Sequence, residues 1–168
     1  MSGHDSYTDA FIRGVLERVR SVAVVGFSNN PVKASYFVAK YLRDKGYTVY
    51  PVNPGIAGQE ALGLTVHASL KDLPAPPDMV DIFRNAQAAS GVTDEAIAAG
   101  ARVVWMQLGV RNDEAAARAE AAGLTVVMDR CPKIEYQRLF GEIGRIGVNS
   151  DVLVNKKQKL TRTFKKLI

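Results

Sequence analysis

Cysteine is nearly absent from this chain of 168 residues, and its single example, Cys131, excludes an internal disulfide. A lone thiol suits a reducing cytosol. Long apolar runs are also missing, since no stretch approaches the ~20 residues of a membrane-spanning helix. The first residues, MSGHDSYTDAF, lack the basic start and apolar core of a secretory signal. We therefore expect a cytoplasmic protein with no membrane partner.

Charge is spread unevenly along the chain. The net charge is +5, but residues 156–168, KKQKLTRTFKKLI, carry six positive charges and no acid, which leaves −1 for residues 1–155. A near-neutral body gives no sign of a nucleic-acid partner. We expect a single domain over 15–148, preceded by an N-terminal extension over 1–14 in which a helix begins. A basic tail over 149–168 follows, and its simplest role is that of a solvated terminus.

Five short β-branched runs predict five buried strands. Three of them follow a glycine by two residues, after Gly46, Gly100 and Gly123, and the other two span 21–25 and 78–83. Glycine just past a helix closes its last turn, and a short continuous apolar run is typical of a strand buried in a parallel sheet. Amphipathic or alanine-rich segments predict helices over 9–20, 32–45, 93–99, 113–122 and 132–142, with Asn112 as an N-cap.

This alternation of strands and helices predicts the fold class α/β, with a Rossmann-like, doubly wound, five-stranded parallel sheet in a single domain. Ligands of such sheets bind outside the carboxyl ends of the strands, where the strand order reverses. The stretch 54–73 is the longest irregular part, and we expect it to hold a short turn or helix between strands.

The stretch GFSNNPVKAS begins at Gly26 and joins the first strand to the next helix. It departs from G-x-G-x-x-G, because Ser28 and Pro31 stand where the second and third glycines would be. A helix start presents unpaired N–H groups, and Ser28 and Ser35 add hydroxyls, so we predict an anion site. Lys33 at the helix start is mildly unfavourable unless an anion lies beside it. The alternative is that Gly26 only permits a tight turn and Lys33 points into water.

The second strand ends in YPVNP and has neither an acid nor an arginine there. NAD sites usually place an acid at this position to hold the ribose hydroxyls, and NADP favours an arginine. A neutral end suits a ligand with a phosphate on its ribose, which a carboxylate would repel. Pro51 and Pro54 would form a rigid wall for an adenine, or they would only end the strand and open a loop.

Polar side chains also follow the third and fourth strands. Arg84 comes directly after an apolar strand, so its guanidinium should emerge at the same edge, where it could bind a phosphate through two hydrogen bonds. Pairing with a surface acid is the alternative. Gln107 would be an uncharged hydrogen-bonding group on this edge, whereas we expect Trp105 in the core.

These strand-end motifs resemble the stand-alone CoA-binding domain family, which is similar to the N-terminal domain of succinyl-CoA synthetase α subunits. The resemblance runs from about Val15 to Arg145 and rests on GFS at the first loop, then PVNP, DIFR, WMQLG and DRC in order. It implies coenzyme A or an acyl-CoA as the ligand. The residues it implies are Gly26, Phe27, Ser28, Pro31, Lys33 and Ser35 at the diphosphate, Val52, Asn53 and Pro54 beside the adenosine, and Phe83 and Arg84 near the nucleotide or its pantetheine arm, with Gln107 on the same edge.

The sequence offers no catalytic constellation and no metal-ligand set. The synthetases pass a phosphate through a histidine in a second domain, whereas His4 and His67 lie outside any such motif, so the resemblance does not carry ligase activity over. Cys131 follows Arg130 near a helix start, which would lower its pKa, and a mixed disulfide with the CoA thiol is one interpretation. A buried, inert thiol is the favoured one.

The sequence therefore predicts a CoA-binding protein, without catalysis of its own, whose partner is a small nucleotide ligand. Two other interpretations stay open. One is an NAD(P)-binding or other adenine-nucleotide domain, and the other is an adaptor that uses its basic tail for nucleic acid or protein. The choice between free CoA and acyl-CoA, a protein partner and the oligomeric state are also left open by the residues.

Overall fold

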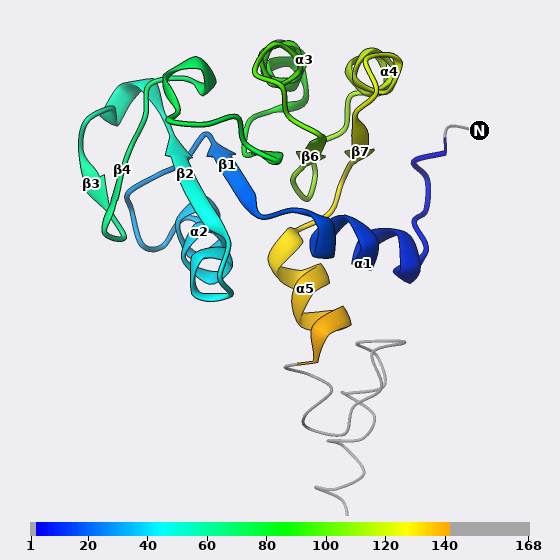
Figure 1. The fold of residues 1–168 in the computed structure, drawn as a ribbon, viewed down its shortest axis with the longest axis horizontal. Helices are drawn as coiled ribbons and strands as arrows, with labels where there is room; N and C mark the ends of the chain where they lie inside the picture. Colours follow the sequence, from blue (N-terminus) through cyan, green and yellow to red (C-terminus); the bar gives the residue numbers. More distant parts are fainter. Residues whose placement is uncertain (1–2, 142–168) are drawn as a thin grey trace, which may run out of the picture.

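Five parallel strands form the predicted sheet, in the order β2-β1-β5-β6-β7, so the doubly wound α/β fold is confirmed (Figure 1). The computed structural model describes residues 3–141. Because β2 and β5 lie on either side of β1, the strand order reverses between β1 and β5. Val25 stands opposite both Val52 and Ile82, so the three strands end level there. The strands are β1 Ser21–Val25, β2 Thr48–Val52, β5 Met79–Ile82, β6 Val103–Met106 and β7 Thr125–Val127.

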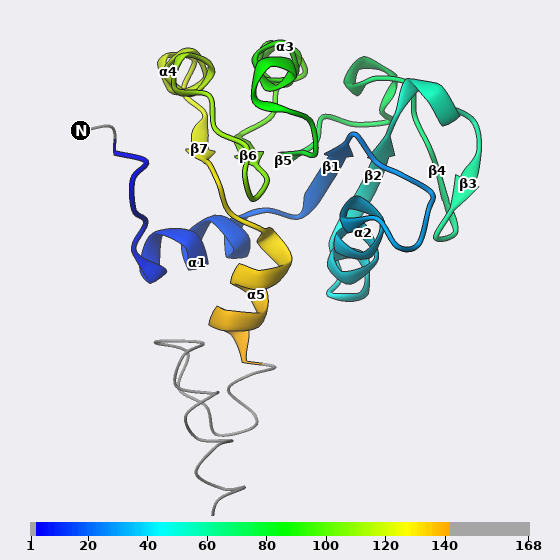
Figure 2. The ribbon, with the colours of Figure 1, turned by 180° about the vertical axis from the view of Figure 1, so that it is seen from behind.

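Helices cover both faces of the sheet (Figures 1 and 2). One face carries α1 Asp9–Arg18, α2 Ala34–Asp44 and α5 Pro132–Phe140, and the other carries α3 Ala86–Ala98 and α4 Asp113–Ala121. Alternate side chains of the strands fill two separate apolar cores: Trp105 packs on the α1–α2–α5 side, and Met106 packs on the α3–α4 side. Trp105 is fully buried as expected, and its indole N–H donates to the carbonyl of Arg130 at 2.8 Å. None of the described helices is long and apolar enough to cross a membrane.

Some element boundaries differ from the sequence predictions. The helix expected over 93–99 begins seven residues earlier, at Ala86, because the Asn85 side chain caps it by accepting from the Ala88 N–H at 2.8 Å. The Asn112 cap is confirmed, with the Ala115 N–H donating at 3.0 Å. The stretch 54–73 holds two short 3-10 turns and a hairpin of β3 Glu60–Ala61 and β4 Leu64–Thr65. The predicted end of the last helix and the basic tail over 149–168 lie outside the described residues.

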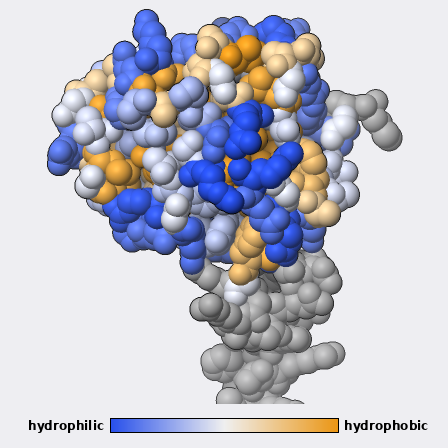
Figure 3. Space-filling view, viewed as in Figure 1, coloured by the Kyte–Doolittle hydropathy of each residue, from blue (hydrophilic) through white to orange (hydrophobic). Residues whose placement is uncertain are grey.

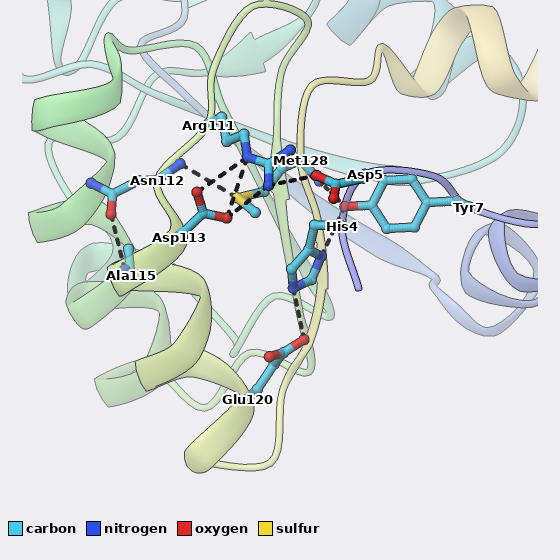
Figure 4. A network of polar contacts seen from close by, with 9 residues as sticks. All are labelled: His4, Asp5, Tyr7, Arg111, Asn112, Asp113, Ala115, Glu120 and Met128. Atoms are coloured by element: carbon cyan, nitrogen blue, oxygen red, sulfur yellow. Dashed lines mark hydrogen bonds and ion pairs between the residues drawn. The ribbon is translucent and has the colours of Figure 1, made fainter. Parts of the chain in front are cut away.

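The N-terminal segment is fastened along β7, the edge strand of the sheet, by polar contacts (Figure 4). The Tyr7 hydroxyl accepts a hydrogen bond from the Met128 N–H at 2.8 Å and shares another with His4 at 3.0 Å. His4 also contacts Glu120 of α4 at 2.9 Å. An edge strand exposes unpaired backbone groups, so this segment satisfies one of them with a side chain.

Replacing Tyr7 with Phe removes the acceptor of the Met128 N–H while the ring is retained. We expect a loss of about 1 kcal/mol in the free energy of unfolding, because a lost hydrogen bond of this kind costs ~0.5–1.5 kcal/mol. Urea denaturation at neutral pH measures it. Tyr36→Phe is the matched control, since the Tyr36 ring stacks on Phe27 and its hydroxyl has no hydrogen bond in the described part. Equal stabilities of the Tyr7 variant and the parent would contradict the proposed contact.

Candidate functional site

The loop after β1 closely approaches the end of β5. Gly26 has φ +87, and a Cβ added to it would lie less than 3.0 Å from the Phe83 carbonyl oxygen, a separation that real Cβ atoms essentially never show. The N–H groups of Gly26 and Phe27 both donate to the Val52 carbonyl, at 3.0 and 3.2 Å. The loop is therefore bound to the ends of β1, β2 and β5 where the strand order reverses.

Side chains inside the loop hold its shape. The Ser28 N–H donates to the Ser35 Oγ at 2.9 Å, and the Asn30 N–H donates to the Ser28 Oγ at 3.2 Å. The Asn53 amide donates to the Phe27 carbonyl at 2.7 Å and accepts from the Gly55 N–H at 2.8 Å. Each serine hydroxyl keeps its own hydrogen to donate, although Ser35 is buried and Ser28 is half-buried. The predicted residues Ser28, Ser35 and Asn53 are thus joined in one network.

The start of α2 presents unpaired backbone donors. Within residues 3–141, the N–H groups of Asn29, Ala34 and Ser35 have no hydrogen-bond acceptor. Lys33 is the N-cap of α2, and its side chain makes no capping hydrogen bond. Free N–H groups and the positive end of the helix dipole favour a bound anion. The arrangement suits a phosphate or diphosphate group.

Arg84 supplies an exposed cation directly over this loop. A Cβ added to Gly26 would lie 3.0 Å from the Arg84 Cδ, which places the arginine side chain against the loop backbone. Neither Arg84 nor Lys33 forms an ion pair or side-chain hydrogen bond with any other described residue. The predicted alternative, in which Arg84 pairs with a surface acid, therefore does not describe the part of the chain that the structure covers.

The remaining predicted residues divide between the surface and the core. Phe27 is fully buried and stacks on Tyr36 with ring centroids 6.2 Å apart, so only its backbone can face a ligand. Val52 and Gln107 are 3% and 7% exposed. Phe83 is half-buried. The exposed members of the set are Pro31, Lys33, Pro54 and Arg84.

Two residues considered for chemistry have structural surroundings. Cys131 is buried at the start of α5. His67 forms an isolated parallel bridge with Val52, and its ring meets Tyr50 edge-on at 6.2 Å. The described residues contain no group of three side chains that could hold a metal ion.

Asp81 is the unusual residue that sequence reasoning passed over. It lies in the middle of β5 with no exposed surface, and neither carboxyl oxygen has a hydrogen-bond partner. Burial raises the pKa of Asp81 well above its ordinary value. The sequence could have indicated this, because Asp81 is an acid inside the apolar run MVDIF. A strand that is buried on both faces leaves such an acid without access to water.

Surface shape adds one feature away from this edge. A cavity of about 710 Å³ lies between the N-terminal segment, α4 and the β7 edge, and none of the predicted site residues lines it. Figure 3 shows hydrophilic side chains around small apolar patches rather than one broad apolar face. The candidate anion site is thus an open surface at the carboxyl ends of β1, β2 and β5.

Comparison with known proteins gives consistent matches. The family model described as "CoA binding domain" matches residues 20–137. The chain is 40% identical over 127 residues to the uncharacterized protein YneT of Bacillus subtilis (strain 168), which covers 76% of this chain and 93% of that protein. It is 39% identical over 64 residues to the acetate–CoA ligase (ADP-forming) II subunit alpha of Pyrococcus furiosus, 38% of this chain and 14% of that subunit. The solved structure of a hypothetical protein from Pyrococcus horikoshii OT3 superposes with a TM-score of 0.77 at 40% identity, covering 82% of this chain and 95% of that one.

Asp81→Asn should change how stability depends on pH. Because the folded-state pKa of Asp81 is raised, the folded protein holds a proton that the unfolded chain releases, so the parent loses stability as pH rises above about 4. The loss relative to the Asn variant should approach about 1.4 kcal/mol per pH unit until the folded-state pKa is reached. Urea denaturation of both proteins from pH 4 to 7 measures this.

Asp78→Asn is a control of opposite sign, for which the denaturation series is extended down to pH 2. Partial burial acts to raise the Asp78 pKa, but hydrogen bonds from the Arg20 and Ser21 N–H groups, at 2.7 and 3.2 Å, outweigh it, so the pKa is lowered. The stability that Asp78 contributes is present above its unfolded pKa and is lost as pH falls through the folded one. Parallel curves for the parent and Asp81→Asn would contradict a protonated Asp81.

Proposed function

Because the chain belongs to the CoA binding domain family, we propose that it binds coenzyme A or an acyl-CoA at the carboxyl edge of its sheet, without catalysing a reaction of its own. Membership of the family supports CoA binding in general. The location of the site and its binding role rest on the residues around Gly26.

One observation carries the location: unpaired N–H groups at the start of α2 lie beside two cations that have no acid partner in the described part. The donors are those of Ala34 and Ser35, and the cations are Lys33 and Arg84. Cations without acid partners create a local positive potential that attracts an anion, and the backbone N–H groups orient that anion through hydrogen bonds. A diphosphate, with several acceptor oxygens and negative charge, matches both.

The neighbouring strand ends supply the rest of the proposed site. Asn53 is tied to the loop by its amide, and Pro54 is exposed beside it, which supports a place for the adenosine at the end of β2. The absence of an acid in YPVNP favours CoA, whose ribose carries a phosphate, over NAD. The pantetheine arm then extends in the other direction, across β5 toward Gln107 at the end of β6.

A thermal-shift panel tests the ligand class. We expect coenzyme A or acetyl-CoA to raise the melting temperature by several degrees, because a ligand at ~100 times its Kd stabilises the folded state by ~2.7 kcal/mol. NAD, NADP and ATP at the same concentration should raise it less. A larger shift with NAD than with any CoA compound would overturn the proposed function.

Arg84→Ala tests the location. Since Arg84 lies over Gly26 on the diphosphate side of the proposed site, its loss should weaken CoA and dephospho-CoA equally, by about 10- to 100-fold for a charge-assisted contact. Isothermal titration measures both ligands. Arg102→Ala is the matched control, because Arg102 is an exposed arginine paired with Asp78 at the opposite edge of the sheet, 2.9 Å away. A loss confined to CoA would assign Arg84 to the ribose phosphate, and no loss would remove it from the site.

A further inference from the structure

Two buried side chains on neighbouring strands have unsatisfied oxygens. Four buried side-chain polar atoms in the described part lack a hydrogen-bond partner, and three of them are the two carboxyl oxygens of Asp81 and the Oε1 of Gln107. The fourth is the hydroxyl of Tyr41, whose ring packs against Tyr136 of α5. Asp81 has no exposed surface, and Gln107 is 7% exposed. Unsatisfied polar atoms at such depth are rare and costly. The occurrence of three of them on two neighbouring strands therefore calls for an explanation.

The strand register brings Asp81 and Gln107 onto the same face of the sheet. Asp81 stands opposite Trp105 on β6, and Gln107 follows two residues later, immediately beyond the strand. The Gln107 N–H still donates to the Ile82 carbonyl at 3.2 Å, so the chain remains alongside β5 there. Neighbouring strands lie ~4.8 Å apart and rise ~3.3 Å per residue, so such diagonal neighbours lie ~8 Å apart at their backbones, within reach of an aspartate and a glutamine side chain.

For the Gln107 Oε1 to bond to Asp81, a proton must be present on the carboxyl. An ionised carboxylate accepts hydrogen bonds and has none to offer, so it could not satisfy the Gln107 Oε1. A protonated carboxyl has one O–H to donate. Burial that raises the pKa of Asp81 agrees with this form. A protonated Asp81 is therefore a donor of the kind that the glutamine oxygen lacks.

We infer that Asp81 is a positioning residue for Gln107: its protonated carboxyl donates a hydrogen bond to the Gln107 Oε1, and this directs the Gln107 amide N–H groups outward to a carbonyl oxygen of the pantetheine arm. The inference deepens the proposed function and rests on it for the identity of the arm. The arm of CoA carries two amide carbonyls, and an acyl-CoA adds a thioester carbonyl, so donors are the groups it needs.

Two ligands and two variants test the inference. Adenosine 3′,5′-bisphosphate has the phosphorylated adenosine without the arm, so it serves as the control ligand for CoA. Asp81→Leu removes the donor, and CoA should bind about 3- to 10-fold more weakly, the usual range for one lost hydrogen bond, while the bisphosphate binds unchanged. Asp81→Asn keeps an N–H donor and should bind CoA as the parent does.

Three results would overturn the inference: unchanged CoA binding by Asp81→Leu, an equal loss for both ligands, or a loss in Asp81→Asn as large as in Asp81→Leu. The second and third indicate a packing role. Melting temperatures of all variants show that each is folded under the binding conditions.

Infrared spectroscopy of the ligand-free protein tests the hydrogen bond apart from CoA. We expect the carbonyl stretching band of a protonated carboxyl at neutral pH, absent in Asp81→Asn and shifted to higher frequency in Gln107→Leu. A missing band, or one that Gln107→Leu leaves in place, overturns the Asp81–Gln107 bond. A parent protein that shows the band but binds neither ligand overturns the proposed function and the arm contact, and leaves the bond established.

Discussion

The approach of the Gly26 backbone to the Phe83 carbonyl is the constraint on which the carboxyl edge depends. A side chain at residue 26 would need both strands to move, since its Cβ would enter the backbone of the neighbouring loop. The two N–H groups that donate to the Val52 carbonyl bind the same loop to β2. Fold and candidate site therefore share one constraint, because the loop that is packed against the ends of β2 and β5 also leads into the start of α2. A substitution at Gly26 consequently changes folding and binding together, whereas a side chain that only lies over the loop, such as Arg84, can report on binding alone.

Two cations at this edge of the described surface have no acid partner, whereas several arginines elsewhere on it are paired. Arg102, Arg118 and Arg138 each contact an acid, at 2.9, 3.0 and 2.6 Å respectively. Such exposed pairs add little stability, yet they cancel local potential. Arg84 and Lys33 lack that cancellation, and Lys33 moreover sits where the dipole of α2 disfavours a cation. A bound anion would make both the unpaired cations and the position of Lys33 at the helix start favourable. The unfavourable charge arrangement of the ligand-free site is thus consistent with an anion site.

Sequence patterns predicted the strands and the Asn112 cap, but they missed the first half of α3 and the direction of the Phe27 ring. The five strands were visible because strands buried on both faces need continuous β-branched runs, and the Asn112 cap was visible because it precedes two acids. The first half of α3 was missed, since AQAASG has low amphipathicity, although Asn85 already carried the cap signal. Phe27 was assigned to the ligand by the family resemblance, yet its ring turns into the core. Periodicity over a few loop residues does not show which way a side chain points.

Asp81 shows how a residue can be unfavourable for the fold and still have a use at the site. Glu135 is nearly as buried, at 8% exposed, but Arg138 neutralises it at 2.6 Å. Asp81 has no such cation, so apart from the inferred bond to Gln107 its neutral carboxyl bears the cost of burial without a partner. An apolar residue would pack there without that cost. What an apolar residue lacks is a proton to donate toward Gln107, which lies two residues beyond the Asp81–Trp105 pair. A buried acid that stays neutral is a fixed hydrogen-bond donor that water does not easily reach. Such a donor would hold the Gln107 amide in one orientation toward a ligand.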